Sequence, residues 1–258
     1  MALAAHLMEI SVGDVRKAMV LGAPAPAAYE ELVDERAARV PLQHLTGRAG
    51  FRRLELSVGP GVFVPRPETE FVAGLAIEAA LGLEASVVVD LCTGSGAIAL
   101  AVADEVPTAT VYAVELGRDA HAWAERNVTD TGLAVDLRLG DATEAFPELD
   151  GTVDVVVANP PYIPVGMVPL DPEVRDHDPE LALFGGSEDG LAIPLAVAHR
   201  AAGLLRPGGL LVMEHADSQG VTLPGALRRT GEWTDVADHD DLTGRPRATT
   251  ARRADHES

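Results

Sequence analysis

The chain of 258 residues carries 20 basic and 40 acidic side chains, a formal net charge of −20, and 47% of its residues are hydrophobic. Such an acidic balance repels a phosphate backbone and argues against duplex nucleic acid as a partner. A single cysteine, no apolar run of roughly 18 residues and no signal-peptide pattern at the start favour a cytoplasmic protein without membrane contact.

Residues 1–40 are expected to form a small helical region. The segment is rich in Ala, and its apolar positions recur at mixed spacings of three and four. The stretch 21–26, which contains one Gly and two Pro, divides it into two pieces.

Residues 41–66 are expected to form a linker that contains a β-hairpin. Residues 51–58 alternate between polar and apolar side chains, which is typical of a strand. Residues 59–61 read Gly-Pro-Gly and predict a turn, after which residues 62–64 predict a second short strand.

Residues 67–258 are expected to form one α/β domain, because strands and helices alternate along it. This alternation predicts a mostly parallel sheet with right-handed crossovers, in which the last of seven strands is a candidate for an antiparallel one. Helices are expected at 68–83, 97–106, 118–131 and 190–205, and strands at 86–91, 110–115, 135–139, 153–158, 210–214, 233–238 and 248–252.

A glycine-rich turn follows the first of these strands. In Gly94-Ser95-Gly96 the missing side chains let a ligand approach the backbone and the free N–H groups of the next helix. Glu115 ends the following strand, where a carboxylate can accept both hydroxyls of a ribose. The pattern also fits a dinucleotide, so the turn alone does not identify its ligand.

Two further acidic positions favour S-adenosylmethionine over a dinucleotide. Asp90 precedes the turn, where a carboxylate can help to hold the amino-acid end of that cofactor. Asp141, followed by Ala142, comes after the third strand, where a carboxylate can accept from the adenine amino group. Cys92 lies in the same turn without an adjacent His or Lys to activate it, and is interpreted as a small buried side chain.

Asn159-Pro160-Pro161-Tyr162 follows the apolar strand 153–158 and points to methyl transfer onto a planar nitrogen. The lone pair of an amide nitrogen is delocalised, so an enzyme must orient it and occupy its hydrogens. The Asn159 side-chain oxygen and the Pro160 carbonyl can accept those hydrogens, and proline fixes φ so that both acceptors are preorganised. Tyr162 offers a ring for stacking near a sulfonium.

These motifs resemble the HemK/PrmC family of protein-(glutamine-N5) methyltransferases over residues 35–252. The resemblance implies a class I Rossmann-like methyltransferase domain with a small helical N-terminal domain. Its stretches are Pro41-Leu42-Gln43-His44-Leu45-Thr46-Gly47, Phe63-Val64-Pro65-Arg66-Pro67-Glu68-Thr69-Glu70, Asp90 to Leu100, Asn159 to Pro164, His177 to Gly186, Leu205 to Gly209 and Asp241 to Arg247.

The resemblance also implies a substrate, the glutamine of the Gly-Gly-Gln motif of peptide chain release factors. It places the substrate glutamine against Asn159 to Tyr162, with Phe63, Arg66 and Glu68 at the rim of the pocket. No metal is implied. The cofactor would contact Asp90, Cys92, Thr93, Gly94, Ser95, Gly96, Glu115, Asp141, Ala142 and Asn159.

Two departures from the family pattern stand out. Cys92 replaces the usual loop glycine, a change expected to be harmless. The helical region before Pro41 is shorter than the family's usual N-terminal domain, which is thought to dock the release factor. Other interpretations remain open here: a different protein glutamine, a nucleic-acid amino group, or a cofactor-binding protein without catalysis.

Overall fold

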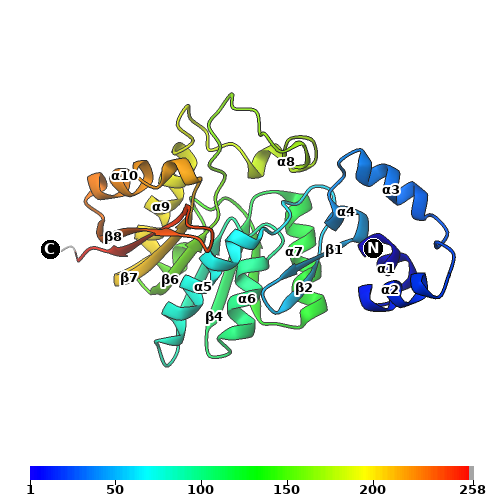
Figure 1. Ribbon diagram of the computed structural model, residues 1–258. Helices are drawn as coiled ribbons and strands as arrows, with labels where there is room; N and C mark the ends of the chain where they lie inside the picture. The colour runs from blue at the N-terminus through cyan, green and yellow to red at the C-terminus, as the bar shows by residue number, and fades with distance from the viewer. Residues whose placement is uncertain (256–258) are drawn as a thin grey trace.

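A seven-stranded sheet lies at the centre of the molecule (Figure 1), in a computed structural model that describes residues 1–255. Its strands are β3 (Val87–Leu91), β4 (Thr110–Glu115), β5 (Val135–Leu139), β6 (Val153–Ala158), β7 (Leu205–Glu214), β8 (Trp233–Asp240) and β9 (Pro246–Arg253). They lie in the order β5-β4-β3-β6-β7-β9-β8. All neighbours from β5 to β7 are parallel, whereas β9 runs antiparallel to both β7 and β8.

Helices cover both faces of the sheet, which explains why its central strands β3 and β6 are apolar at every position except Asp90 and Asp154. Val88 and Val155 point into one core, and their chain neighbours Val89 and Val156 point into the other. The first core is covered by α5 (Pro67–Leu81), α6 (Ala97–Glu105) and α7 (Arg118–Thr131), and the second by α9 (Ala192–Leu204) and α10 (Thr222–Thr230).

The strand order reverses between β3 and β6. From β3 the chain builds β4 and β5 on one side and then crosses back to place β6 on the other. The carboxyl ends of these two strands therefore flank the switch point at which open α/β sheets bind ligands. The glycine turn follows β3 and Asn159 follows β6, so this topology alone brings the two motifs together.

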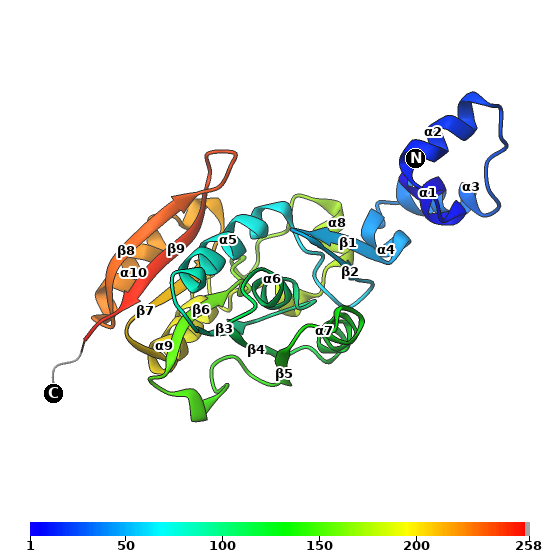
Figure 2. The same cartoon turned by 90° about the horizontal axis from the view of Figure 1, so that it is seen from below.

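The N-terminal helices stand beside the sheet rather than on it (Figure 2). The linker after them contains a two-stranded antiparallel hairpin. These elements are α1 (Ala2–Met8), α2 (Val12–Val20), α3 (Tyr29–Ala37), α4 (Leu42–Thr46), β1 (Arg48–Phe51) and β2 (Leu54–Ser57).

The predicted position of the hairpin was wrong. Residues 51–58 are not one strand, because the chain turns at Arg52, where φ is 51°, and Phe51 pairs with Leu54 across the turn. This arrangement buries Phe51 in the core and places the Arg52 guanidinium against Glu105. Residues 62–64 are extended but belong to no strand.

Other predicted strands and helices from residue 67 onward are confirmed within about two residues, except that β7 begins at Leu205. Short helices were missed: α8 (Pro172–His177), α10, and the 3-10 turns η1 (Pro147–Leu149), η2 (Glu180–Ala182) and η3 (Asp217–Gln219). Pro224 and Gly225 disguise α10, while α8 is too short for a periodic pattern. Throughout residues 1–255, no helix combines the length and apolarity that crossing a membrane requires.

Candidate active site

A cavity of about 490 Å³ opens at the switch point between β3 and β6. Its walls come from the segment before α5, the loop after β3, the end of β4 and the turn after β5. The segment after β6, together with Glu214 of β7 and Arg247 of β9, completes them. The cavity thus collects side chains from most of the stretches that carried a motif, whereas the stretches 41–47 and 205–209 contribute none.

The glycine turn presents its backbone to this cavity. Gly94 has φ of 59°, and a Cβ built on it would meet no atom within 4 Å, so the turn opens into free space there. Gly96, with φ of 84°, caps α6 and lies against Leu100. The Asn127 side chain fixes the turn from below by donating to the Ser95 carbonyl at 2.9 Å.

Glu115 lies at the end of β4 and closes the turn from the opposite side. Its two carboxylate oxygens accept hydrogen bonds from the Gly94 amide at 2.8 Å and the Gly117 amide at 2.7 Å. Burial raises the pKa of this carboxyl group, and the two amides act against that effect. A partly desolvated carboxylate therefore borders the cavity beside the turn.

Asp90 lies behind the turn and is not among the residues that line the cavity. Its Oδ2 accepts from the Thr93 hydroxyl at 2.6 Å and from the Ala99 amide at 3.1 Å. The side chain is fully buried, and burial raises its pKa to about 7. Asp90 thereby positions the turn and the start of α6.

Cys92 lines the cavity in a left-handed conformation, with φ of 71°. This backbone region is unfavourable for any residue with a Cβ. Burial raises the pKa of the thiol well above its usual range, so the side chain stays protonated and is no nucleophile. The replacement of glycine here therefore has a conformational cost.

The turn after β5 forms the far end of the cavity. Asp141 accepts hydrogen bonds at Oδ1 from the Thr143 amide at 2.8 Å and from the Thr143 hydroxyl at 2.7 Å. Ala142 is nearly buried, and all three residues line the cavity. The small side chain of Ala142 leaves room for a flat ring beside the Asp141 carboxylate.

Asn159-Pro160-Pro161-Tyr162 forms the opposite end. Asn159 Nδ2 donates to the Thr69 hydroxyl at 3.4 Å, and the Tyr162 hydroxyl donates to Glu214 Oε1 at 3.4 Å. Gln219 Nε2 holds the Tyr162 carbonyl at 3.0 Å. Pro160 is buried, and it is the member of the tetrapeptide that does not line the cavity.

Three residues that line this end had not been singled out as site residues: Thr69, Glu214 and Arg247. Glu214 is 2% exposed, and burial raises its pKa to about 7. The available signal was a charged residue directly after the apolar run 210–213, since a buried charge at a strand end is uncommon.

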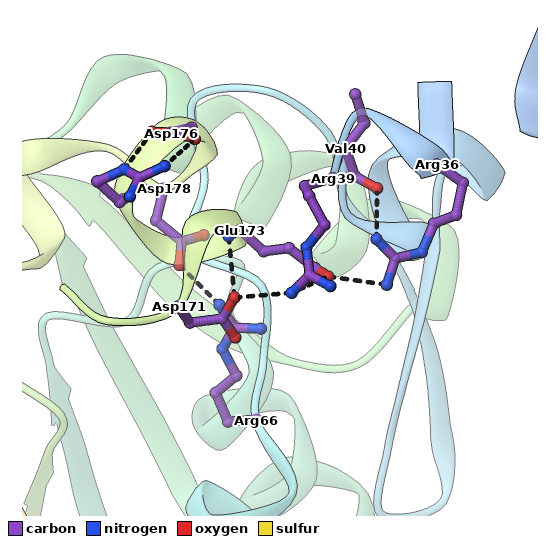
Figure 3. Close-up of polar contacts among 9 residues, drawn as sticks. Arg36, Arg39, Val40, Arg66, Asp171, Glu173, Asp176 and Asp178 are labelled. Atoms are coloured by element: carbon purple, nitrogen blue, oxygen red, sulfur yellow. Dashed lines mark hydrogen bonds and ion pairs between the residues drawn. The ribbon is translucent and has the colours of Figure 1, made fainter. Parts of the chain in front are cut away.

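A segment around α8 borders the cavity and contributes Asp171, Val174 and Leu181 to its lining. Ion pairs tie this segment to distant parts of the chain (Figure 3). Arg36 of α3 lies 2.8 Å from Glu173, and Arg66 lies 2.7 Å from Asp178.

His177 lies at the end of α8. It is partly buried, and its ring meets that of His44 edge-on with centroids 6.5 Å apart. The short helix thus brings the imidazole to the linker.

Comparisons with known proteins identify the family. Residues 54–167 match the model of the Methyltransferase small domain. A release factor glutamine methyltransferase of Streptomyces coelicolor is 56% identical, in a match that covers 98% of this chain and 89% of the relative.

A 4-amino-L-phenylalanine/4-methylamino-L-phenylalanine methyltransferase of Streptomyces pristinaespiralis is 44% identical, in a match that covers 90% of this chain and 80% of the relative. The solved Thermus thermophilus 16S rRNA N2 G1207 methyltransferase, in complex with AdoMet and guanosine, shares the fold. It matches with a TM-score of 0.57 and 21% identity, over 80% of this chain and 49% of that one. On this evidence of sequence and fold, the chain belongs to the family of release factor glutamine methyltransferases.

Proposed function

We propose that this protein transfers a methyl group from S-adenosylmethionine to the side-chain amide of the Gly-Gly-Gln glutamine of peptide chain release factors, in the cytoplasm. One observation carries the proposal: Asn159 and Tyr162 share a single cavity with Gly94 and Glu115. This shared cavity supports a site in which the tetrapeptide would hold the amide and the turn would hold the nucleoside.

The residues present fit S-adenosylmethionine, and membership of a methyltransferase family favours it over a dinucleotide. The open space at Gly94 admits a ligand against the backbone, and Glu115 offers acceptors for two ribose hydroxyls. Asp141 and Ala142 would hold the adenine, while Cys92, Thr93 and Ser95 would border the rest. Gly96 does not line the cavity and would act by shaping the turn. When bound, this cofactor supplies an electrophilic methyl group.

The tetrapeptide prepares the accepting nitrogen. Asn159 Oδ1 and the Pro160 carbonyl would accept hydrogen bonds from the two N–H groups of the substrate amide. Both acceptors lie in the amide plane, so the nitrogen lone pair points away from them. Two consecutive prolines keep these acceptors fixed before the substrate arrives. Tyr162 would stack on the flat substrate amide. Together with Pro161, it would fix the plane in which that amide lies. The amide proton leaves after transfer, so no strong base is required.

Three parts of the chain have separate tasks in this proposal. Residues 1–40 dock the release factor, and residues 67–258 bind the cofactor and the glutamine. Residues 41–66 link these two parts. The ion pairs between α3 and the α8 segment support a connection between the first and the last of these (Figure 3). A release factor held by the helices would lie beside the segment that borders the cavity.

Labelled methyl transfer tests the function with three acceptors. Wild-type enzyme should label a purified release factor and should not label the same factor with its Gly-Gly-Gln glutamine replaced by alanine. Free 4-amino-L-phenylalanine is the third acceptor, because a relative is named for it. Labelling of the amino acid in preference to the release factor would overturn the proposed substrate and favour an aromatic amine.

A further inference from the structure

Three side chains from separate elements meet at the substrate end of the cavity. Asn159 follows β6, Thr69 lies in the first turn of α5, and Glu214 ends β7. Asn159 Nδ2 donates to Thr69 Oγ1 at 3.4 Å. Burial raises the pKa of the Glu214 carboxyl group, and the nearby Thr69 side chain acts to lower it. Thr69 and Glu214 are only 4% and 2% exposed, so their polar groups depend mainly on partners within the protein.

The direction of these hydrogen bonds decides which end of the Asn159 amide faces the cavity. When Glu214 is ionised, its unpartnered Oε2 can only accept, so the proton between the two groups must come from the Thr69 hydroxyl. The hydroxyl oxygen is then free to accept, and the NH2 group of Asn159 is the end that can donate to it. Asn159 Oδ1 has no hydrogen-bond partner in residues 1–255, and remains available as an acceptor.

We propose that Thr69 and Glu214 are positioning residues that fix the rotation of the Asn159 side chain, so that Oδ1 meets the N–H group of the substrate amide. This inference rests on the proposed function. The opposite rotation would present the NH2 group of Asn159 to the substrate, where a donor would face a donor. A contact of 3.4 Å is long for a hydrogen bond and is expected to shorten when substrate binds.

The same carboxyl group also positions the second half of the tetrapeptide. The Tyr162 hydroxyl donates to Glu214 Oε1, so Glu214 acts on the ring that would stack against the amide. Arg247 of β9 lowers the pKa of Glu214, and Glu68 of α5 raises it. One buried carboxylate thus serves both Asn159 and Tyr162.

A purely structural role explains Glu214 poorly. Burying a carboxylate is costly, and its Oε2 has no partner of good hydrogen-bond geometry within residues 1–255. An apolar side chain at the end of β7 would pack with less cost. The unused acceptor capacity is instead available to the Thr69 hydroxyl when the site tightens around a substrate.

Replacement of the hydroxyl at equal volume tests the inference. Thr69→Val should lower kcat for a release factor about tenfold, while the Kd for S-adenosylmethionine stays within about twofold of the wild type. Thr69→Ser should restore most of the turnover, because it restores the hydroxyl. Thr249→Val is the matched control: Thr249 is fully buried in β9 with an unpartnered hydroxyl, and its variant should keep wild-type kcat.

Glu214→Gln removes the charge with almost no change of shape and should also lower kcat more than cofactor affinity. Wild-type turnover in Thr69→Val, or equal losses in Thr69→Val and Thr69→Ser, would overturn the inference while the proposed function stands. Wild-type enzyme that leaves the release factor unmethylated would overturn both. Thermal melting of each variant separates these outcomes from a failure to fold.

Discussion

The amide of Gly94 donates to Glu115 Oε2 at 2.8 Å, which joins the turn after β3 to the end of β4 at the cofactor end of the cavity. The carboxylate has a second amide partner in Gly117. Besides Asn127 and Asp90, the turn is therefore held by a side chain that is itself expected to bind the ribose.

Glu115→Gln should weaken cofactor binding, because a neutral amide accepts more weakly and its NH2 group opposes the Gly94 amide. A charge-assisted hydrogen bond is worth about 1.5–3 kcal/mol, so the Kd for S-adenosylmethionine should rise more than about tenfold. Calorimetry measures it. Glu105→Gln, which removes the partner of Arg52 outside the cavity, is the control and should keep wild-type affinity. Equal affinity in Glu115→Gln and wild type would refute the role.

Asn159→Ala should lower turnover much more than cofactor affinity. Its side chain is expected to act mainly on the accepting amide, so kcat should fall about 10²–10³-fold, as for the loss of one preorganised hydrogen-bonding group. The Kd for cofactor should change much less. Steady-state kinetics at saturating cofactor, combined with calorimetry, measure both quantities. Equal losses in both would place Asn159 in cofactor binding instead.

The left-handed backbone of Cys92 predicts an inverted order of stability between two small substitutions. At most positions alanine is more stable than glycine, but at positive φ the Cβ of alanine is unfavourable by about 1–2 kcal/mol. Cys92→Gly should therefore be about 1 kcal/mol more stable than Cys92→Ala in urea unfolding. Ala103→Gly in α6 is the contrasting control and should be destabilising by about 1 kcal/mol. The usual order at position 92 would contradict the observed conformation.

Asp90 predicts a pH dependence of stability. Burial raises its folded-state pKa from 3.8 to about 7, so the folded protein holds a proton that the unfolded chain has released. The contribution of this group to the free energy of unfolding is full below pH about 4 and is lost as the pH rises toward 7, by up to about 1.4 kcal/mol per pH unit. Asp90→Asn lacks this titration.

Unfolding in urea at a series of pH values measures the difference between wild type and Asp90→Asn. The wild type should lose stability relative to the variant from pH 4 to pH 7. A constant difference across this range would show that Asp90 is ionised throughout.

The ion pair between Arg36 and Glu173 predicts a measurable connection between the N-terminal helices and the segment that borders the cavity. Arg36→Glu should raise the KM for the release factor a few-fold, since partly exposed pairs contribute up to about 1 kcal/mol. Adding Glu173→Arg should restore the lower KM. Arg175→Glu, which breaks an exposed pair with Asp176 on the same helix, is the control. Absence of recovery in the double variant would argue against the pair.

The sequence predicted those parts of the fold that depend on local patterns. The buried strands 87–91 and 153–158 were identifiable because helices on both sides require nearly all of their residues to be apolar. The same strand pattern predicted that Gly94 and Asn159 lie close together, since both motifs come at the carboxyl ends of parallel strands.

Contacts between segments that are far apart in the chain could not be predicted from the sequence. Arg36 and Glu173 are 137 residues apart, and no local pattern pairs one charge among many with another. The interaction of Thr69 with Glu214 likewise depends on how α5 packs beside β7. The hairpin was misplaced because the turn at Arg52 uses no glycine or proline and is stabilised by its contact with Glu105.

Tandem mass spectrometry of a release factor, before and after incubation with the enzyme and S-adenosylmethionine, tests the central claim most directly. We expect one added methyl group on the Gly-Gly-Gln peptide, with fragment ions that place it on the glutamine side chain, and no addition with Asn159→Ala. An unmodified glutamine, with the methyl group on another residue or on another acceptor, would contradict the account.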